Sequence, residues 1–151
     1  MDQFHIQVDL ALGRMFEIYN LLNKKPKEYV SGMLLYYSEI HMIEAIGRHQ
    51  DSNLTELAGI LNITKGTASK TIAKLGSKGL ICKFQREDNK KEVHFRLTEL
   101  GQLAFEGHYR YHESRSSDID RDFDSYSPDE QKLILHFIER YTEELSRYLE
   151  E

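Results

Sequence analysis

The sequence predicts a mainly α-helical fold with one small β-hairpin, and three observations support this prediction. Only two prolines occur among 151 residues, against an average of about 5%, so long helices can continue without interruption. Apolar residues recur at helical spacing near both ends of the chain. Between residues 80 and 97 the apolar period changes from that of a helix, about 3.6 residues, to that of a strand, about 2.

The first predicted element is a long amphipathic helix over residues 4–22. Its apolar side chains share one face: Phe4, Val8, Ala11, Leu12, Met15, Ile18, Tyr19 and Leu22. The segment up to Pro26 ends this helix, and residues 27–37 are expected to be less regular. Ser38 is the expected N-cap of a second helix that ends near Gly47.

Two short helices are predicted next. Asn53-Leu-Thr-Glu56 has the pattern of a capping box at the start of a helix over residues 54–61. Thr64 can cap a further helix over residues 65–78, and Gly79 follows where a left-handed C-terminal cap is favoured. Two short helices separated by a few residues are typical of the helix-turn-helix, whose second helix lies in the major groove of DNA.

A hairpin is predicted directly after the helix-turn-helix. Residues 80–84 and 93–97 alternate as strands do, and the polar run 85–92 joins them. A hairpin in this place is the wing of a winged helix. Cys82, on the first strand, is expected to be a small buried residue, and as the sole cysteine it is typical of a reducing, cytoplasmic location.

Two more long helices complete the chain. Thr98 is expected to cap a helix that continues to about Asp122, and Ser127-Pro-Asp-Glu130 is a second capping box with proline at the first helical position. The final helix has an apolar face formed by Leu133, Ile134, Phe137, Ile138, Tyr141, Leu145 and Tyr148. The terminal helices have more apolar surface than a small winged helix could cover, which favours a dimerisation layer.

The total charge of −5 conceals an uneven distribution. Residues 62–91 contain eight basic and two acidic side chains, a net charge of +6, which leaves −11 on the other 121 residues. A basic island in an acidic chain favours a nucleic-acid partner. No stretch approaches the roughly 20 uninterrupted apolar residues of a membrane helix, so no membrane partner is expected.

Residues expected to contact DNA lie on the second short helix and in the hairpin loop. Small hydroxyls and lysines at the start of that helix allow its backbone to approach DNA closely. Thr67, Ser69 and Lys70 are expected near base edges, and Lys65 and Lys74 near phosphates. The predicted DNA-binding set is Thr64, Lys65, Thr67, Ser69, Lys70, Lys74, Arg86, Lys90 and Lys91. A merely solvated lysine-rich face is the alternative, which the adjoining basic hairpin disfavours.

These motifs resemble the MarR family of bacterial transcriptional regulators. The resemblance rests on the helix-turn-helix over residues 53–79 and on the segment Phe95-Arg-Leu-Thr-Glu-Leu-Gly101 at the end of the wing. It implies a homodimer that binds a pseudo-palindromic operator in double-stranded DNA and usually represses, with an effector changing its affinity. The single chain, residues 1–151, would contain a DNA-binding lobe at 38–98 and helical dimerisation regions at 1–37 and 99–151.

The wing tip departs from the family pattern. The family commonly has Asp-x-Arg at this tip, whereas the matching residues here are Asn89 and Lys91. Because lysine lacks the planar fork of arginine, the usual ion pair within the wing and the usual minor-groove contact are not expected in the same form.

Three histidines are candidate metal ligands: His41, His108 and His112. His108 and His112 are one helical turn apart, a spacing that is common in zinc chelates. The trio is similar to the histidines of the sensor site in the zinc-responsive regulators of streptococci and lactococci, which belong to this family. A zinc site here would also need a carboxylate, from Glu39, Glu44, Glu106 or Glu113. Residues 38–47 also resemble fatty-acid-synthesis regulators of the FabT type, which need no metal. Zinc is therefore one alternative, and histidines hydrogen-bonded between packed helices are the other; DNA binding itself requires no cofactor.

Three classes of effector remain open: a small molecule, an acyl carrier and a metal. A group of large side chains could line a pocket for an aromatic or acyl group, or could simply form core and dimer interface: Met33, Tyr36, Tyr37, Phe105, Tyr109 and Tyr111.

Two other classes of protein are disfavoured. The sequence contains neither a phosphate-binding glycine loop nor Gly-x-Ser-x-Gly, so an enzyme is not expected. A winged helix used only for protein association would need an apolar recognition face in place of lysines and hydroxyls.

Overall fold

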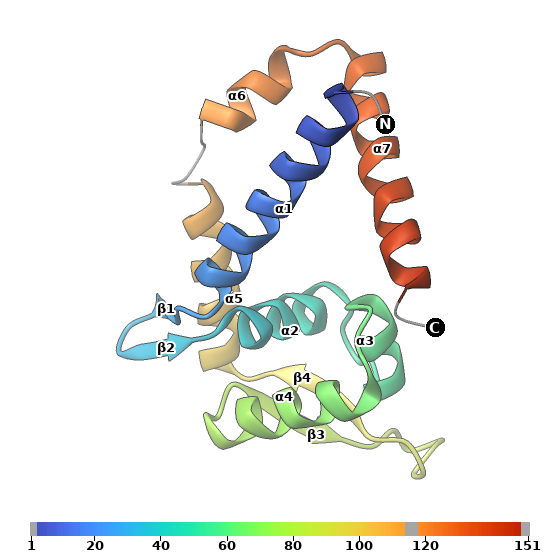
Figure 1. Cartoon of the computed structure of the whole chain (residues 1–151). Helices are drawn as coiled ribbons and strands as arrows, with labels where there is room; N and C mark the ends of the chain where they lie inside the picture. The colour runs from blue at the N-terminus through green and yellow to red at the C-terminus, as the bar shows by residue number, and fades with distance from the viewer. Residues whose placement is uncertain (1–2, 114–117, 149–151) are drawn as a thin grey trace. The chain divides into compact units, whose positions relative to one another are not determined.

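The computed structural model describes residues 3–113 and 118–148, and the chain divides into two compact units at Tyr111/His112. The elements of the first unit are α1 (Gln3–Asn23), β1 (Lys27–Val30), β2 (Met33–Leu35), α2 (Tyr37–Arg48), α3 (Leu54–Ile60), α4 (Lys65–Ser77), β3 (Ile81–Phe84), β4 (His94–Leu97) and most of α5 (Glu99–Glu113) (Figure 1). The second unit contains the end of α5, α6 (Asp118–Ser125) and α7 (Pro128–Arg147). The predicted mainly α-helical fold with a winged helix-turn-helix is confirmed.

The caps of the helix-turn-helix form as predicted. Asn53 Oδ1 accepts from the backbone N–H of Glu56 at 3.0 Å, and the Glu56 carboxylate accepts from the N–H of Asn53 at 2.8 Å. The Thr64 hydroxyl accepts from the N–H of Thr67 at 3.1 Å at the start of α4. Gly79 follows α4 with φ +70, a conformation that costs glycine little because it has no Cβ.

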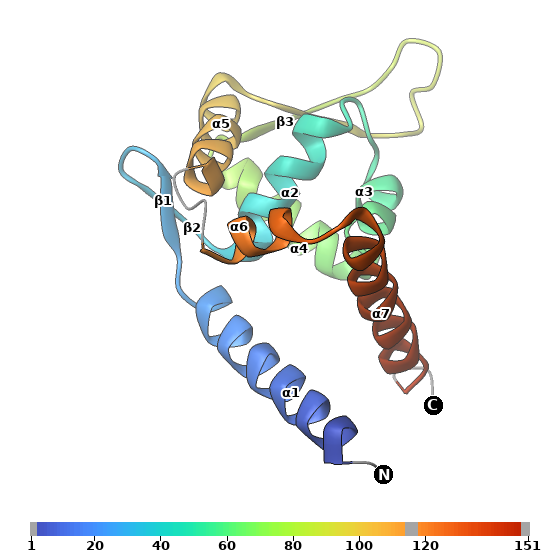
Figure 2. The ribbon, with the colours of Figure 1, turned by 90° about the horizontal axis from the view of Figure 1, so that it is seen from above.

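The wing is an antiparallel pair whose register runs from Ile81 opposite Leu97 to Phe84 opposite His94. An isolated bridge between Asn53 and His94 joins this pair to the start of α3. Figure 2 shows the loop between β3 and β4 reaching away from the helices of the lobe. The expectation that Cys82 is buried is wrong: Cys82 is exposed, because Ile81 takes the inward position and the next residue of a strand faces the other side.

Residues 27–35 are more regular than predicted. They form the hairpin β1–β2, which turns at Gly32 with φ +75. Ser38 is not the N-cap of α2, because the helix starts at Tyr37, two residues earlier than expected, and the N-cap is Tyr36. The carboxylate of Glu39 accepts from the N–H of Tyr36 at 2.9 Å, which is the contact that the N3 glutamate makes in a capping box.

The core of the first unit lies around α2, which contacts α3, α4 and β4. Apolar side chains at helical spacing are buried on both helices: Ile40, Ile43 and Ile46 on α2, and Ala68, Ile72 and Leu75 on α4. Leu57, Leu80 and Phe95 complete this core from α3 and the wing. The second helix of the helix-turn-helix, α4, is called the recognition helix below. It packs on α2, and so does the wing through β4.

The segment from Thr98 to Gly101 fixes the start of α5 against the wing. The Thr98 hydroxyl accepts from the N–H of Gly101 at 3.1 Å and donates to the carbonyl of Gly79 at 2.7 Å. A Cβ on Gly101 would overlap the carbonyl oxygen of Leu80. Glycine is therefore required where α5 crosses the backbone of the residue before β3.

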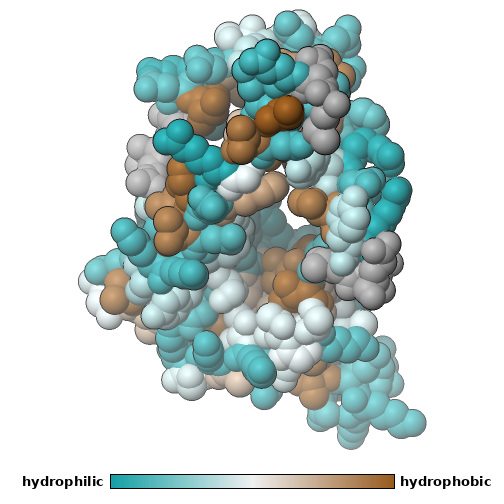
Figure 3. All heavy atoms as spheres, in the orientation of Figure 1, coloured by the Kyte–Doolittle hydropathy of each residue, from teal (hydrophilic) through white to brown (hydrophobic). Residues whose placement is uncertain are grey.

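The helices α1 and α7 differ from this core in their burial. None of the described residues of α1 or α7 is buried, and brown apolar side chains are visible along α1 in Figure 3. The helix predicted to run to about Asp122 is described as α5 to Glu113 and as α6 from Asp118, and residues 114–117 lie outside the described residues. The capping box of Ser127 and Glu130 at the start of α7 is confirmed. Within the described residues, no helix has the length and apolar content that crossing a membrane would require.

Candidate nucleic-acid interface and histidine cluster

The residues predicted to contact DNA on and before α4 are all exposed, opposite the buried stripe of that helix: Thr64, Lys65, Thr67, Ser69, Lys70 and Lys74. The hydroxyls of Thr64 and Thr67 lie 2.9 Å apart, so the helix start presents a pair of linked hydroxyl groups. Thr71 instead is buried and donates to the carbonyl of Thr67. The exposed face of α4 therefore carries short polar side chains and positive charges, as contact with a base edge or a phosphate requires.

The wing tip is ordered by uncharged groups. Asn89 Oδ1 accepts from the N–H of Lys91 at 3.1 Å, and the amide of Gln85 donates to the carbonyl of Lys90 at 2.7 Å. Both contacts use the lysine backbones, so the ammonium groups of Lys90 and Lys91 extend into solvent at this tip. The structure thus has an Asx turn where the family pattern has an ion pair.

Asp51, which the sequence analysis did not single out, holds the base of the wing. Its carboxylate accepts two hydrogen bonds from Arg96, at 2.5 and 3.0 Å, and its carbonyl accepts from His94 Nδ1 at 2.7 Å and from Arg86 at 3.4 Å. The hydrogen bonds from Arg96 hold the pKa of Asp51 below its usual value of 3.8. Asp51 has φ +64, which aspartate tolerates better than most residues. Three wing side chains thus converge on one residue of the turn before α3.

His94 is a buried member of this wing base. Its side chain is 4% exposed, and its Nε2 lies 3.8 Å from the Glu92 carboxylate. That nitrogen makes no hydrogen bond within residues 3–113 and 118–148. The ring also stacks on Phe84, whose other contact is the guanidinium of Arg96, 4.0 Å from the ring centroid.

A buried ion pair ties α4 to the start of α2. Glu39 is 2% exposed, and the Lys78 ammonium donates to both of its carboxylate oxygens, at 2.7 and 2.8 Å. Lys78 also donates to the carbonyl of Leu34 in β2. The C-terminal end of the recognition helix is therefore fixed to both the β1–β2 hairpin and α2.

Two of the three predicted metal ligands lie together. The ligand atoms of His41, Glu44 and His108 are all within 4.8 Å of one another. His41 Nδ1 is 3.2 Å and His108 Nδ1 is 3.7 Å from the Glu44 carboxylate, which Arg48 also contacts at 3.0 Å. Among the described residues, His112 is not part of this group. The i, i+3 spacing of His41 and Glu44 on α2 is the sequence signal for the carboxylate.

Aromatic rings surround the cluster. Tyr37 lies on His41 with ring centroids 4.0 Å apart, and Tyr29 contacts His108 edge to face at 5.3 Å. Tyr19 from α1 donates a hydrogen bond to Tyr37. Burial raises the pKa of the Tyr37 hydroxyl above its ordinary value of 10.0.

Of the large side chains expected to line an effector pocket or to form core and dimer interface, three have described surroundings that bear on a cavity. Tyr36 lines a cavity of about 330 Å³ with Asn23, Lys24, Ser38, Glu39 and Lys74. Tyr37 and Tyr111 do not line this cavity and instead make edge-to-face contacts with Tyr19 and Tyr29.

Comparisons with known proteins agree with the fold. Residues 35–93 match the model of the MarR family. The chain is 36% identical over 108 residues to the HTH-type transcriptional regulator PchR of Bacillus subtilis, an alignment that covers 72% of this chain and 64% of that protein. The chain thus spans less than two thirds of the length of this relative.

Solved structures with the same fold include two DNA complexes. Lactococcus lactis ZitR bound to DNA superposes with a TM-score of 0.72 at 23% identity, over 96% of this chain and 99% of that one. Streptococcus pneumoniae FabT bound to DNA superposes with a TM-score of 0.70 at 21% identity, over 95% of this chain and 99% of that one. Another structure of ZitR is described as that of a zinc-responsive MarR family member.

Proposed function

Because this chain belongs to the MarR family through its winged-helix region, we propose that it is a homodimeric, sequence-specific DNA-binding transcriptional regulator. The observation that carries the proposal is the outer side of α4, where exposed hydroxyls and lysines stand beside a basic wing. In such a dimer two copies of α4 enter successive major grooves about 34 Å apart, and each wing reaches a neighbouring minor groove. An effector that changes the separation of the two helices would lower affinity without touching a DNA contact.

Duplex binding at increasing salt tests the proposal. A regulator that neutralises several phosphates should lose about a thousandfold or more in affinity between about 50 and about 200 mM salt. Lys70→Ala and Lys74→Ala should each weaken binding, whereas Lys132→Ala, which removes an exposed lysine of α7, serves as the matched control. Unchanged binding by both α4 variants would refute the assigned face.

A zinc-dependent form of the same regulator is a second candidate, supported by the cluster of His41, Glu44 and His108. Two imidazoles and one carboxylate fit zinc, which commonly takes three protein ligands of this kind and leaves one position open. Bound zinc would act as a crosslink between α2 and α5. The three side chains would supply the ligand atoms, and Arg48 would have to share or release Glu44.

Zinc titration of dialysed protein tests this candidate. One zinc per protomer should bind, and His41→Ala and His108→Ala should each abolish that binding. His112→Ala decides whether the third predicted histidine is a ligand, and His136→Ala on α7 is the control. If wild-type protein takes up no zinc, the cluster is a hydrogen-bonded pair of histidines around Glu44.

A further inference from the structure

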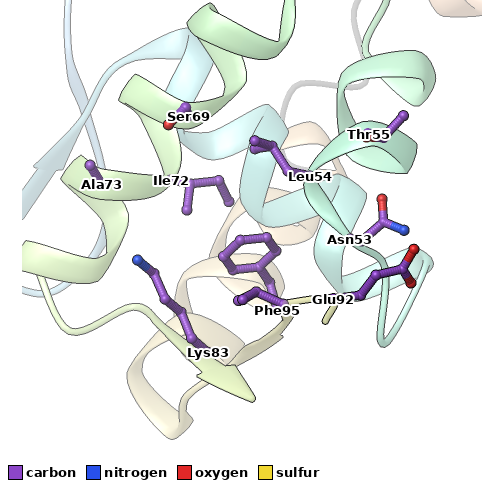
Figure 4. A pocket seen from close by; sticks show the side chains of 10 residues that line it. Asn53, Leu54, Thr55, Ser69, Ile72, Ala73, Lys83, Glu92 and Phe95 are labelled. Carbon is purple, nitrogen blue, oxygen red and sulfur yellow. The ribbon is translucent and has the colours of Figure 1, made fainter. Parts of the chain in front are cut away.

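A cleft of about 410 Å³ lies between the recognition helix and the wing (Figure 4). Leu54, Ile72 and Phe95 form its apolar floor, and Ser69 and Ala73 of α4 border it on one side. Lys83 of β3 and Glu92 of the wing loop lie on opposite sides of Phe95. Lys83 is not among the residues that the sequence predicts to contact DNA.

We propose that this cleft binds the sugar–phosphate strand that separates the major groove from the minor groove, with Lys83 contacting a phosphate. The proposal rests on the proposed function. If α4 occupies the major groove and the wing tip a minor groove, the strand between those grooves must pass between α4 and the wing. The cleft lies at that position and opens between these two elements.

The side chains of the cleft match such a strand. Lys83 is exposed, and within residues 3–113 and 118–148 it makes no ion pair or hydrogen bond, so its ammonium is available to a phosphate. The hydroxyls of Thr55 and Ser69 line the same cleft and can donate to phosphate oxygens. The apolar floor suits the carbon atoms of a deoxyribose.

Glu92 acts in the opposite sense. Its carboxylate repels a phosphate, so it should restrict the strand to the side of the cleft that holds Lys83 and Ser69. Glu92 is half exposed, and its carboxylate lies 3.8 Å from Nε2 of the buried His94. Lys83 and Glu92 therefore form a pair of opposed charges that sets where the strand crosses.

Binding of the wild-type protein and the variants Lys83→Ala and Glu92→Gln should be compared on two duplexes. One is selected from random DNA by the wild-type protein, and the other is an unselected duplex. Loss of one phosphate contact makes the negative slope of log affinity against log salt less steep by about 0.9, so Lys83→Ala should make it less steep by about 1.8 for a dimer and weaken binding to both duplexes alike. Glu92→Gln should strengthen binding, and Lys132→Ala should change neither the slope nor the affinity.

A neutral methylphosphonate at single backbone positions identifies the contact. At the phosphate facing the cleft it should weaken wild-type binding but leave Lys83→Ala unaffected, because the partner is already absent. Suppose that Lys70→Ala and Lys74→Ala weaken binding, while Lys83→Ala keeps the wild-type salt dependence and responds to methylphosphonate at every backbone position as the wild-type protein does. The cleft assignment is then wrong, and the proposed function stands. If the wild-type protein selects and binds no duplex, both the cleft assignment and the proposed function are wrong. Circular dichroism of each variant verifies that the fold is intact.

Discussion

At the scale of single residues, the side chains proposed to contact DNA differ from the side chains that hold the lobe together. The proposed contacts are lysines and hydroxyls of α4, which can be recognised in the sequence by type and position. Asp51, Glu39 and Lys78 belong to the second group. The pairs Glu39–Lys78 and Asp51–Arg96 were not predicted, because the two partners are far apart in the chain and no local spacing reveals such a pair.

Asp51→Asn should loosen the wing without unfolding the lobe. Asparagine accepts the positive φ of this position and keeps the backbone carbonyl that His94 and Arg86 contact, but it loses the charged pairing with Arg96. Hydrogen exchange of the β4 amides should therefore become faster while that of α2 is unchanged. Asp51→Glu tests geometry, since it keeps the charge on a longer side chain. Equal protection of β4 in wild-type protein and Asp51→Asn would contradict the role assigned to this pair.

The same pairing gives a sign for the dependence of wing order on pH. The pKa of Asp51 is lower in the folded chain than its usual 3.8 because of Arg96. The stabilisation is therefore fully present at neutral pH, and it is lost as the pH falls through the lowered folded value. Protection of β4 should decline in this acidic range in the wild-type protein and should lack this component in Asp51→Asn.

Lys78→Ala should destabilise the lobe more than removal of an ordinary surface lysine. The substitution leaves the carboxylate of Glu39 buried without its counter-ion, which costs about 3–5 kcal/mol for fully buried pairs. Because Lys78 is 30% exposed, water can reach the site and about 2 kcal/mol is expected. Urea unfolding measures this change, with Lys132→Ala as control. Glu39→Gln combined with Lys78→Ala should recover part of the loss, and a double variant no more stable than Lys78→Ala would argue against an uncompensated charge.

At the scale of elements, helix termini were the most predictable feature. The capping boxes at Asn53 and Ser127 formed as expected because each is complete within four residues. The hairpin β1–β2 was missed because neither Lys-Glu-Tyr-Val nor Met-Leu-Leu alternates between apolar and polar residues. The start of α2 was displaced because Glu39 caps from inside the helix.

Gly101→Ala tests the contact between α5 and the wing. A methyl group there would overlap the Leu80 carbonyl oxygen, and backbone cannot yield as a flexible side chain can, so a loss of about 2–3 kcal/mol in the free energy of unfolding is expected. Gly76→Ala is the matched control, because its Cβ meets nothing within 4 Å. It should stabilise α4 by about 0.5–1 kcal/mol. If the two substitutions change the free energy of unfolding by similar amounts, the close approach of Gly101 to the Leu80 carbonyl is not what excludes a larger residue at that position.

At the scale of the whole molecule, the charge is divided between one basic segment and an acidic remainder. The positive segment 62–91 coincides with α4 and the wing, while the rest of the chain is acidic. If the chain binds DNA as proposed, its acidic helices repel DNA and favour approach through the basic lobe. This division was visible in the sequence, whereas the convergence of His41, Glu44 and His108 depended on the packing of α2 and α5.

Dimerisation is the expected use of the uncovered apolar surface of α1 and α7. Leu10 is 69% exposed and Leu133 is 67% exposed, and burying such side chains against a second copy contributes roughly 1.5–3 kcal/mol each. Light scattering should give about twice the chain mass of 17.8 kDa. Leu10→Glu and Leu133→Glu should shift the protein towards monomer, while Lys132→Glu, beside Leu133 on α7, should remain dimeric.

DNA affinity should follow the oligomeric state in these variants. A monomer reaches only one half-site, so it loses the contribution that the linked second lobe makes through its high effective concentration. Leu10→Glu and Leu133→Glu should therefore bind a palindromic duplex about as weakly as a single half-site, although every residue of α4 and the wing is unchanged. Monomers that kept the full preference for a palindrome would separate DNA recognition from dimerisation and assign the apolar faces of α1 and α7 to another partner.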